Sequence, residues 1–588
     1  MRSSLKSWLA ILFSVLLIVG TLPFSVEAKG KEVDYGKYSQ VALGKDGMVA
    51  TAHPLASEIG AEVLRTGGNA IDAAVAIQFA LNVVEPMMSG IGGGGFMMVY
   101  DGKTKDTTII NSRERAPEGA TPDMFLDENG KAIPFAERVE SGTAVGVPGT
   151  LKGLDTALEK WGTRPMQQLI GPAIKLADKG FPIDSVLASA IEDSKEKLSK
   201  SAASDVFLPN GKPLEEGDTL VQKDLANTFK MIRSKGADAF YKGAISEAIA
   251  DTVQKYGGSM TTKDLNKYDV TIDQPIWGDY QGYQIASMPP PSSGGVFLLQ
   301  MLKILDDFNL SQYDVKSWEK YHLLAETMHL AYADRAAYAG DPEFVKVPLK
   351  GLLHPEYIKE RQELISLDRV NQNPTAGNPW KYESDTANYK LTAQPTDRKY
   401  GETTHFTVAD RWGNVVSYTT TIEQVFGTGI MVPGYGFMLN NELTDFDAVP
   451  GGANEVQPNK RPLSSMTPTI VFQDGKPVLT VGSPGGPTII TSVLQTILYA
   501  IEYDMELKAA VEEPRIYTNN LSSYRFEEGI SQAVLTKLNK MGHKFETSPV
   551  EIGNVQSILI DTENGTFKGV ADSSRNGAAI GVDFKGNR

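Results

Sequence analysis

The sequence predicts a mixed fold of helices and strands, of the α/β or α+β class, and three observations support this prediction. The chain has 588 residues. Because one hydrophobic core stops growing at roughly 250–300 residues, we expect two large units or one layered domain with insertions. Residues 148–364 carry a mostly helical pattern, whereas short strands dominate after residue 402. No repeat with a period of roughly 20–50 residues is visible, which excludes a solenoid or a propeller.

Composition and charge limit the functional classes. Hydrophobic residues make up 41% and charged residues 22% of the chain, as in an ordinary globular protein. The 57 Lys and Arg against 72 Asp and Glu give a net charge of −15. This charge argues against a nucleic-acid partner, since phosphate backbones require clustered positive charge. The absence of cysteine excludes disulfides, thiol nucleophiles and cysteine-based metal sites.

Residues 1–28 are predicted to form a secretory signal peptide. Arg2 and Lys6 precede an apolar run, Trp8–Gly20, and Val26-Glu27-Ala28 is a small-residue cleavage pattern. A membrane anchor is the alternative, but a membrane span needs ~20 apolar residues and this run is shorter. We therefore expect a mature chain that starts at Lys29 and is secreted without a membrane anchor. A cysteine-free exported chain suits a Gram-positive source.

The first predicted elements surround a run of glycines. One helix extends from Pro54 to Leu64, and Asn69 can cap a second helix that Pro86 ends. Residues 90–95 follow and lead into a strand, Phe96–Tyr100. The glycines match G-x-G-x-x-G, but a dinucleotide site needs the order strand, glycines, helix, so we reject that function. We expect these glycines to let neighbouring backbone approach closely.

Two histidines lie on one face of a helix in the middle of the chain. His322 and His329 are seven residues apart, and neither an H-E-x-x-H motif nor a carboxylate partner accompanies them in the sequence. We therefore expect ordinary packing rather than a metal site there, and no metal or organic cofactor anywhere in the protein.

The region after residue 368 combines a predicted connection with a predicted hairpin. Residues 368–402 are polar and contain prolines, which indicates an exposed, mobile connection. Strands are predicted at 404–409 and 415–422 around a turn at 410–414. This hairpin places Thr403 opposite Thr421, or opposite Ile422 if the turn has two residues. Beyond it we expect strands at 467–472, 478–482, 555–561 and 569–571 and a helix at 489–502.

Elimination leaves one nucleophile strategy for a secreted hydrolase. The G-x-S-x-G motif is absent, no histidine lies in a triad context, and cysteine is excluded. A threonine or serine at a new chain terminus can use its own α-amine as the base. Such a site needs a cut where a mobile segment meets the first residue of a strand, and residues 401–406 are the one place in the sequence where this occurs. The simpler alternative is that Thr403 and Thr421 merely favour β-structure.

Six motifs in order resemble the γ-glutamyltransferase (γ-glutamyl transpeptidase) family, and its secreted Bacillus-type members most closely. The resemblance covers most of the chain. The six motifs are residues 90–96, 112–114, 290–295, 403–406, 461–469 and 482–486. The resemblance implies a four-layer αββα sandwich of the N-terminal-nucleophile hydrolase type. It also implies self-cleavage between Glu402 and Thr403, which gives a large subunit (29–402) and a small subunit (403–588) that remain together as a heterodimer.

The resemblance further implies roles for individual residues. Thr403 would attack its own preceding carbonyl and later the γ-carbonyl of γ-glutamyl substrates, passing the acyl group to water or to amino acids and peptides. The implied binding and catalytic residues are Thr421 beside the nucleophile, Gly485 and Gly486 as oxyanion hole, Arg113, Ser464 and Ser465 for the substrate α-carboxylate, and Asp445, Glu423 and Glu442 for its α-ammonium. Taken singly, each of these residues also has an ordinary structural explanation.

Two departures from the family pattern affect the expected substrates. Glu423 and Glu442 are carboxylates where some members carry amides, so the ammonium side should be more negative. The stretch 446–463 is shorter than in members that fold a lid over the substrate, so we expect an open cleft that admits poly-γ-glutamate as well as glutathione or glutamine. A cephalosporin (glutaryl) acylase of the same fold and an uncleaved secreted protein that binds acidic peptides are the alternatives.

Overall fold

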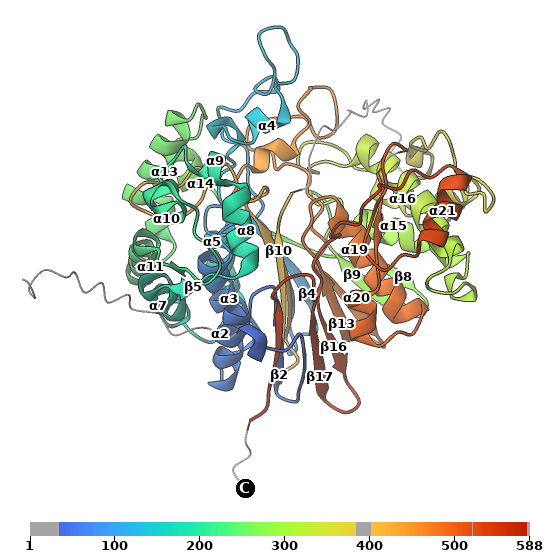
Figure 1. The fold of residues 1–588 in the computed structure, drawn as a ribbon, viewed down its shortest axis with the longest axis horizontal. Coiled ribbons are helices and arrows are strands. Elements are labelled where there is room, and N and C mark those ends of the chain that lie inside the picture. Colours follow the sequence, from blue (N-terminus) through green and yellow to red (C-terminus); the bar gives the residue numbers. More distant parts are fainter. Residues whose placement is uncertain (1–34, 384–400, 520, 585–588) are drawn as a thin grey trace, which may run out of the picture. The chain divides into compact units, whose positions relative to one another are not determined.

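The computed structural model describes residues 35–383, 401–519 and 521–584 (Figure 1). The predicted signal peptide and residues 384–400 of the predicted connection lie outside the described residues. Two seven-stranded antiparallel sheets form the centre. The first sheet, in spatial order, contains β18 (Ala578–Val582), β2 (Gly47–Thr51), β10 (Thr404–Asp410), β11 (Val415–Thr421), β3 (Gly94–Tyr100), β4 (Thr107–Asn111) and β7 (Thr271–Asp273). The second contains β1 (Val41–Gly44), β17 (Thr566–Ala571), β16 (Gln556–Asp561), β13 (Lys476–Gly482), β12 (Thr469–Gln473), β9 (Tyr283–Ser287) and β8 (Ile276–Tyr280).

Helices cover the outer face of each sheet. On the first sheet lie α2 (Pro54–Arg65), α3 (Ala70–Val84), α5 (Thr150–Trp161), α7 (Gly171–Lys179), α11 (Lys223–Lys235) and α13 (Ala244–Lys255), together with the shorter α6 (Met166–Leu169), α8 (Ser185–Asp193), α9 (Lys195–Leu198), α10 (Ser204–Phe207), α12 (Asp238–Tyr241) and α14 (Thr262–Lys267). The short α4 (Phe135–Arg138) lies outside this layer, at the top of Figure 1. On the second lie α15 (Gly294–Asp306), α16 (Trp318–Tyr338), α17 (Leu349–Leu352), α18 (Pro355–Gln362), α19 (Thr488–Ile497), α20 (Leu507–Glu512) and α21 (Gln532–Met541). Figure 1 shows these two groups on opposite sides of the sheets.

Alternation along the strands creates three separate cores. In β2, Met48 packs between the two sheets whereas Val49 packs against the helices on the first sheet. In β12, Ile470 lies between the sheets and Val471 faces α15 and α16. Successive side chains of a strand point to opposite faces, so each strand contributes to two cores. The resulting helix–sheet–sheet–helix order confirms the predicted αββα sandwich.

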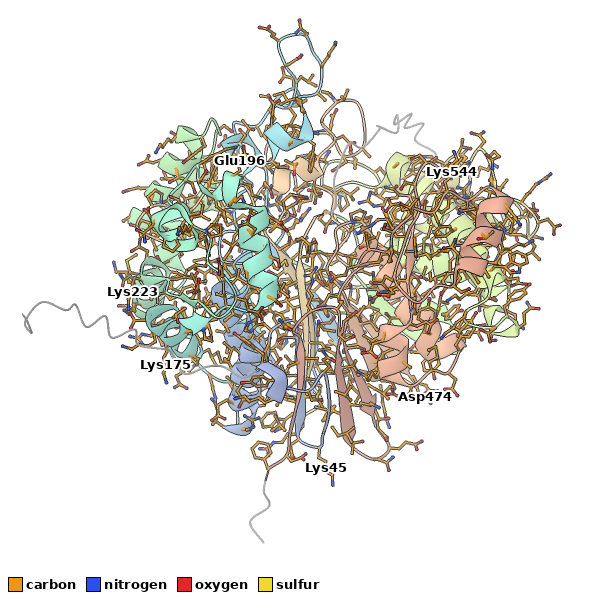
Figure 2. The ribbon with its side chains drawn as sticks, viewed as in Figure 1. Lys45, Lys175, Glu196, Lys223, Asp474 and Lys544 are labelled. Atoms are coloured by element: carbon orange, nitrogen blue, oxygen red, sulfur yellow. The ribbon has the colours of Figure 1, made fainter. Side chains whose placement is uncertain are left out.

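Charged side chains project from the outside of this sandwich. Lys175 and Lys223 extend from the helices on the first sheet, and Asp474 extends from the turn between β12 and β13 (Figure 2). In the described part of the chain, no helix has the length and apolar character needed to cross a membrane.

Several sequence predictions are confirmed and others are wrong. The two early helices and the hairpin at 404–422 are present, and Asn69 and Asp72 form a reciprocal cap at the start of α3. The predicted helix 489–502 is also present, as α19 up to Ile497 followed by one π-helical turn to Glu502. The mostly helical region, however, also contains β7, β8 and β9. The described part of the connection is not simply exposed, because Val370 and Pro379 are buried. Strand β2 was not predicted because both its faces are buried, which hides the alternation.

Candidate active site

The nucleophile candidate lies at the start of a central hairpin. Strand β10 pairs with β11 so that Thr404 faces Thr420 and His405 faces Thr419. The same register continued by one residue sets Thr403 opposite Thr421, as the sequence predicted. The carboxylate of Asp410 closes the turn by accepting hydrogen bonds from the N–H groups of Trp412 and Asn414. Local turn chemistry therefore fixes which residue faces Thr403.

A chain of hydrogen bonds joins the nucleophile candidate to the peptide bond before it. The Thr403 hydroxyl donates to Thr421 Oγ1 over 3.2 Å, and the Thr421 hydroxyl donates to the carbonyl oxygen of Glu402 over 2.8 Å. The N–H of Glu423 donates to Thr421 Oγ1 at 2.8 Å and fixes its orientation. Thr421 can therefore accept the proton of Thr403 and polarise the Glu402 carbonyl at the same time.

The side chain before that peptide bond is also anchored. The Glu402 carboxylate accepts a hydrogen bond from Arg575 Nη2 at 2.8 Å, and the same nitrogen lies 2.7 Å from Glu551. The N–H of Glu402 donates to the carbonyl of Glu423 at 2.6 Å. The residues on both sides of the 402–403 bond are thus held in place.

Gly485 and Gly486 lie between the end of β13 and the start of α19, and Gly486 lies against Gly401. Their φ angles are 125° and 57°, in the region that favours glycine. A Cβ on Gly486 would lie 2.8 Å from the backbone nitrogen of Gly401. Gly486 therefore permits a close approach of the Gly401 backbone to a helix N-terminus, which attracts negative charge.

Arg113 is the centre of a buried group of carboxylates. Its side chain is 1% exposed, and its Nη2 donates to Asp445 at 2.5 Å while its Nη1 pairs with Glu442. Glu114 lies 4.0 Å away and is completely buried. Burial raises the pKa of Glu442 to about 7 against the opposing effect of Arg113, and burial together with Glu442 raises the pKa of Glu114 well above its usual range. The group can therefore retain a proton near neutral pH.

Sheet pairing connects this group to the nucleophile candidate. Thr421 faces Gly94 across β11 and β3. A Cβ on Gly94 would lie 2.5 Å from Glu114 Oε2 and 2.5 Å from the carbonyl oxygen of Ser112. The absence of a side chain at Gly94 thus lets the 112–114 segment approach the strand residue that pairs with Thr421. Gly94 therefore links the two halves of the candidate site.

The remaining predicted residues lie around Arg113 and Thr421. Arg113 Nη2 donates to the carbonyl of Leu463 at 3.1 Å, which places Ser464 and Ser465 directly after an Arg113 contact. Ser465 Oγ accepts a hydrogen bond from Arg335 Nη2 at 2.9 Å. Glu423 follows Thr421 by two residues with a φ of 79° and is 7% exposed.

Comparison with known proteins identifies the family to which this chain belongs. The sequence profile of the gamma-glutamyltranspeptidase family matches residues 56–582. The chain belongs to the gamma-glutamyltranspeptidase family. It is 78% identical over 583 residues to the glutathione hydrolase proenzyme of Bacillus subtilis (strain 168), and the match covers 99% of each chain.

Solved structures of related gamma-glutamyltranspeptidase-like chains support the fold. A cephalosporin acylase from Bacillus halodurans superimposes with a TM-score of 0.83 at 26% identity, over 94% of this chain and 99% of that chain. The Helicobacter pylori gamma-glutamyltranspeptidase has a TM-score of 0.55 at 41% identity, over 57% of this chain and 97% of that chain.

In this gamma-glutamyltranspeptidase family member, sequence reasoning assigned no role to four neighbours of the site. Glu114 was quoted only as part of a motif, and Arg335, Arg575 and Glu85 were not singled out. Glu85 accepts a hydrogen bond from the Thr404 hydroxyl at 2.9 Å, and burial raises its pKa to about 7. The last three are single residues brought to the site by long-range packing, so no local pattern indicated them.

Proposed function

We propose that this chain is the precursor of a secreted γ-glutamyl hydrolase and transferase that cleaves itself between Glu402 and Thr403. The single observation that carries the proposal is the hydrogen-bonded chain from Thr403 through Thr421 to the Glu402 carbonyl. The identity to a relative named as a glutathione hydrolase proenzyme supports both the activity and the precursor state.

Maturation exchanges an amide bond for an ester and then for two free termini. The Thr403 oxygen attacks the Glu402 carbonyl carbon, and its proton passes by way of Thr421 to the leaving amide nitrogen. The C–N bond breaks, and an ester now joins Glu402 to the Thr403 side chain. Water hydrolyses this ester, which leaves a carboxylate on Glu402 and a free α-amine on Thr403.

Catalysis on a substrate repeats the attack with the new terminus. The α-amine of Thr403 is partly neutral near pH 7 and takes the hydroxyl proton directly or through water. The oxygen attacks the γ-carbonyl, and the N–H groups of Gly485 and Gly486 stabilise the negative oxygen. The amine leaves with a proton, and water or an amino-acid amine then removes the γ-glutamyl group from Thr403.

Charge placement accounts for recognition of the γ-glutamyl head group. Arg113 with Ser464 and Ser465 would hold the α-carboxylate, and Asp445 with its neighbouring carboxylates would hold the α-ammonium. Arg113 pairs with Asp445 and Glu442 in the structure. A substrate that carries one positive and one negative group could replace both halves of this pairing without leaving a buried charge alone.

The short stretch 446–463 supports a wide substrate range. Lys460 Nζ stabilises the conformation of this stretch by donating hydrogen bonds to the carbonyls of Ala453 and Glu455, at 2.9 Å each. Asn454 Nδ2 donates to the backbone carbonyl of Asp445 at 2.7 Å, so the loop also fixes the main chain of the residue whose carboxylate pairs with Arg113. We propose that poly-γ-glutamate is accepted alongside glutathione. Hydrolysis of small γ-glutamyl amides without release of glutamate from the polymer would contradict this part of the proposal.

The alternative function, a cephalosporin acylase, is supported by the similar structure from Bacillus halodurans. One assay distinguishes it from a γ-glutamyl hydrolase. A glutaryl group lacks the α-ammonium that Asp445 would bind, so the enzyme should turn over γ-glutamyl-p-nitroanilide and not glutaryl-p-nitroanilide. The opposite preference would identify an acylase. If the chain stays in one piece and turns over neither substrate, a binding protein would be favoured.

Export by way of residues 1–28 is also part of the proposal. N-terminal sequencing of protein recovered from culture medium tests it.

A further inference from the structure

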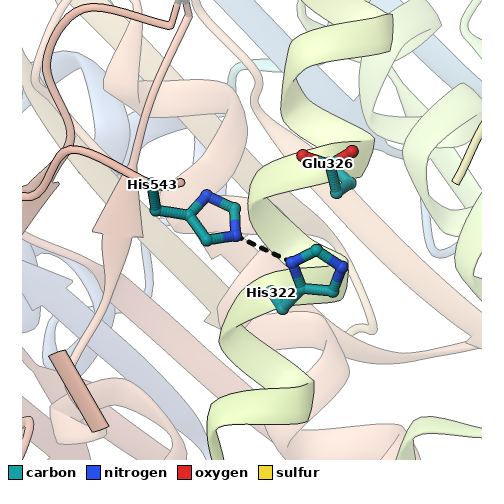
Figure 3. A group of neighbouring side chains, drawn as sticks. All are labelled: His322, Glu326 and His543. Atoms are coloured by element: carbon teal, nitrogen blue, oxygen red, sulfur yellow. Dashed lines mark hydrogen bonds between the residues drawn. The ribbon is translucent and has the colours of Figure 1, made fainter. Parts of the chain in front are cut away.

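Three side chains with metal-binding atoms meet away from the candidate active site. His322 and Glu326 lie one turn apart on α16, and His543 follows the end of α21 (Figure 3). One ligand atom from each of the three lies within 4.8 Å of the other two, and all three residues are buried. The expectation that no carboxylate accompanies His322 was therefore wrong, because the spacing of four residues on a helix brings Glu326 onto the same face.

The hydrogen bonds of His322 leave its Nδ1 with a lone pair. His322 Nε2 lies 2.7 Å from the carbonyl oxygen of Ser366. A carbonyl oxygen can only accept a hydrogen bond, so Nε2 must be the donor and carries the proton of a neutral His322. Nδ1 then faces His543 Nε2 at 2.7 Å. A histidine ligand normally donates its other N–H to a backbone carbonyl in this way, which fixes the ring and its tautomer.

Glu326 presents one carboxylate oxygen that makes no hydrogen bond among the described residues. Its Oε2 accepts a hydrogen bond from the N–H of Asn371 at 2.8 Å. Its Oε1 makes no hydrogen bond within the described part of the chain, and His329 Nδ1 lies 3.4 Å from it. The residue is 1% exposed. Burial of a carboxylate oxygen without a hydrogen bond is costly, and a cation beside the oxygen would offset that cost.

We propose that His322, Glu326 and His543 bind one divalent transition-metal ion, with Zn²⁺ as the best match to two imidazole nitrogens and one carboxylate oxygen. Metal binding would require only a small increase in the separation of the two imidazole nitrogens. Two nitrogens bound to Zn²⁺ at ~2.1 Å in tetrahedral geometry lie roughly 3.4 Å apart, compared with 2.7 Å between His322 and His543. His543 would bind through Nε2 with its proton on Nδ1.

The ion would have a structural role that rests on the proposed maturation. Cleavage at 402–403 places His322 and Glu326 in one fragment and His543 in the other. A metal ion held by both fragments would join them at the outer helical layer, far along the chain from the cut. Binding itself requires no cleavage, since the uncut chain contains the same three ligands.

Zinc binding to the full-length protein tests the proposal. Wild type and the uncut variant Thr403→Ala are stripped with a chelator and titrated with Zn²⁺ against a chromophoric competitor. We expect one tightly bound Zn²⁺ per chain in both, a rise of ~2 °C or more in the unfolding temperature, and a visible absorption band of four-coordinate Co²⁺ when Co²⁺ replaces it. Glu326→Gln and His543→Gln should each weaken binding by at least ~10²-fold.

His354→Asn is the matched control, because His354 caps α18 and stacks on Tyr382 outside the cluster. It should bind Zn²⁺ as wild type does. If His543→Gln fails to fold, Glu326→Gln decides, since glutamine keeps the shape and the acceptor for Asn371. Absence of tight binding, or equal binding by wild type and Glu326→Gln, would overturn the proposal. Failure of wild type to cleave itself would instead contradict the proposed maturation and leave the zinc result standing.

Discussion

At the scale of single residues, Thr421 performs two tasks with one hydroxyl. It accepts a hydrogen bond from the Thr403 hydroxyl and donates one to the Glu402 carbonyl. We predict that Thr421→Val slows cleavage of the precursor by roughly 10²-fold, the usual cost of losing one donor to a reacting carbonyl oxygen. The uncut fraction over time on a denaturing gel measures this. Thr421→Ser keeps the hydroxyl and should mature far faster than Thr421→Val; equal rates for the two variants would contradict the assigned role.

Glu85 makes the stability of the folded chain depend on pH, and the direction of this dependence follows from its raised pKa. Burial raises the pKa from 4.5 to about 7, so the folded chain holds a proton that the unfolded chain has released. This contribution to stability is complete below the unfolded value and is lost as the pH rises through about 7.

We therefore predict that Glu85→Gln flattens the pH dependence of stability between about pH 5 and 7, by up to ~1.4 kcal/mol per pH unit. Unfolding temperatures of Thr403→Ala with and without Glu85→Gln measure this in an uncut chain. Identical slopes in the two proteins would show that Glu85 does not titrate as inferred.

At the scale of elements, the link between β13 and α19 passes close to the backbone of Gly401. We predict that Gly486→Ala blocks cleavage or greatly slows it, because the added Cβ would lie 2.8 Å from the nitrogen of Gly401. Gly475→Ala is the matched control. Gly475 has a φ of 74° in the β12–β13 turn, so the backbone strain is comparable, but a Cβ there meets nothing within 4 Å. If both variants mature normally, the close approach has no functional role.

The same elements show what the sequence could and could not predict. The register of Thr403 with Thr421 was predictable because one local turn, closed by Asp410, sets it. The two early helices were predictable because their caps are local. Glu85 and Arg575 reach the 402–404 segment from 319 and 173 residues away, and no local pattern encodes such contacts. Strand β2 was hidden for a related reason, since burial on both faces depends on the second sheet.

At the scale of the whole molecule, both sheets interleave the two predicted fragments. In the first sheet β10 and β11 lie between β2 and β3, so strands from after the cut are hydrogen-bonded on both sides to strands from before it. In the second sheet β12 pairs with β9 and β17 pairs with β1. Separation of the fragments would break both sheets and expose the core between them.

We predict that the fragments of the cleaved protein co-elute in native gel filtration and separate only at denaturant concentrations that also abolish the folded circular dichroism signal. Elution of a free small fragment under native conditions would contradict the interleaved arrangement. The uncut Thr403→Ala chain provides the reference elution volume.

The most direct test of the account compares wild type with Thr403→Ala on a denaturing gel, with N-terminal sequencing of any smaller fragment. The account predicts two wild-type bands, the smaller starting Thr-Thr-His-Phe, and one uncut, inactive band for the variant. An uncut wild-type chain, a cut at another position, or cleavage of Thr403→Ala would contradict the assignment of Thr403 as the nucleophile.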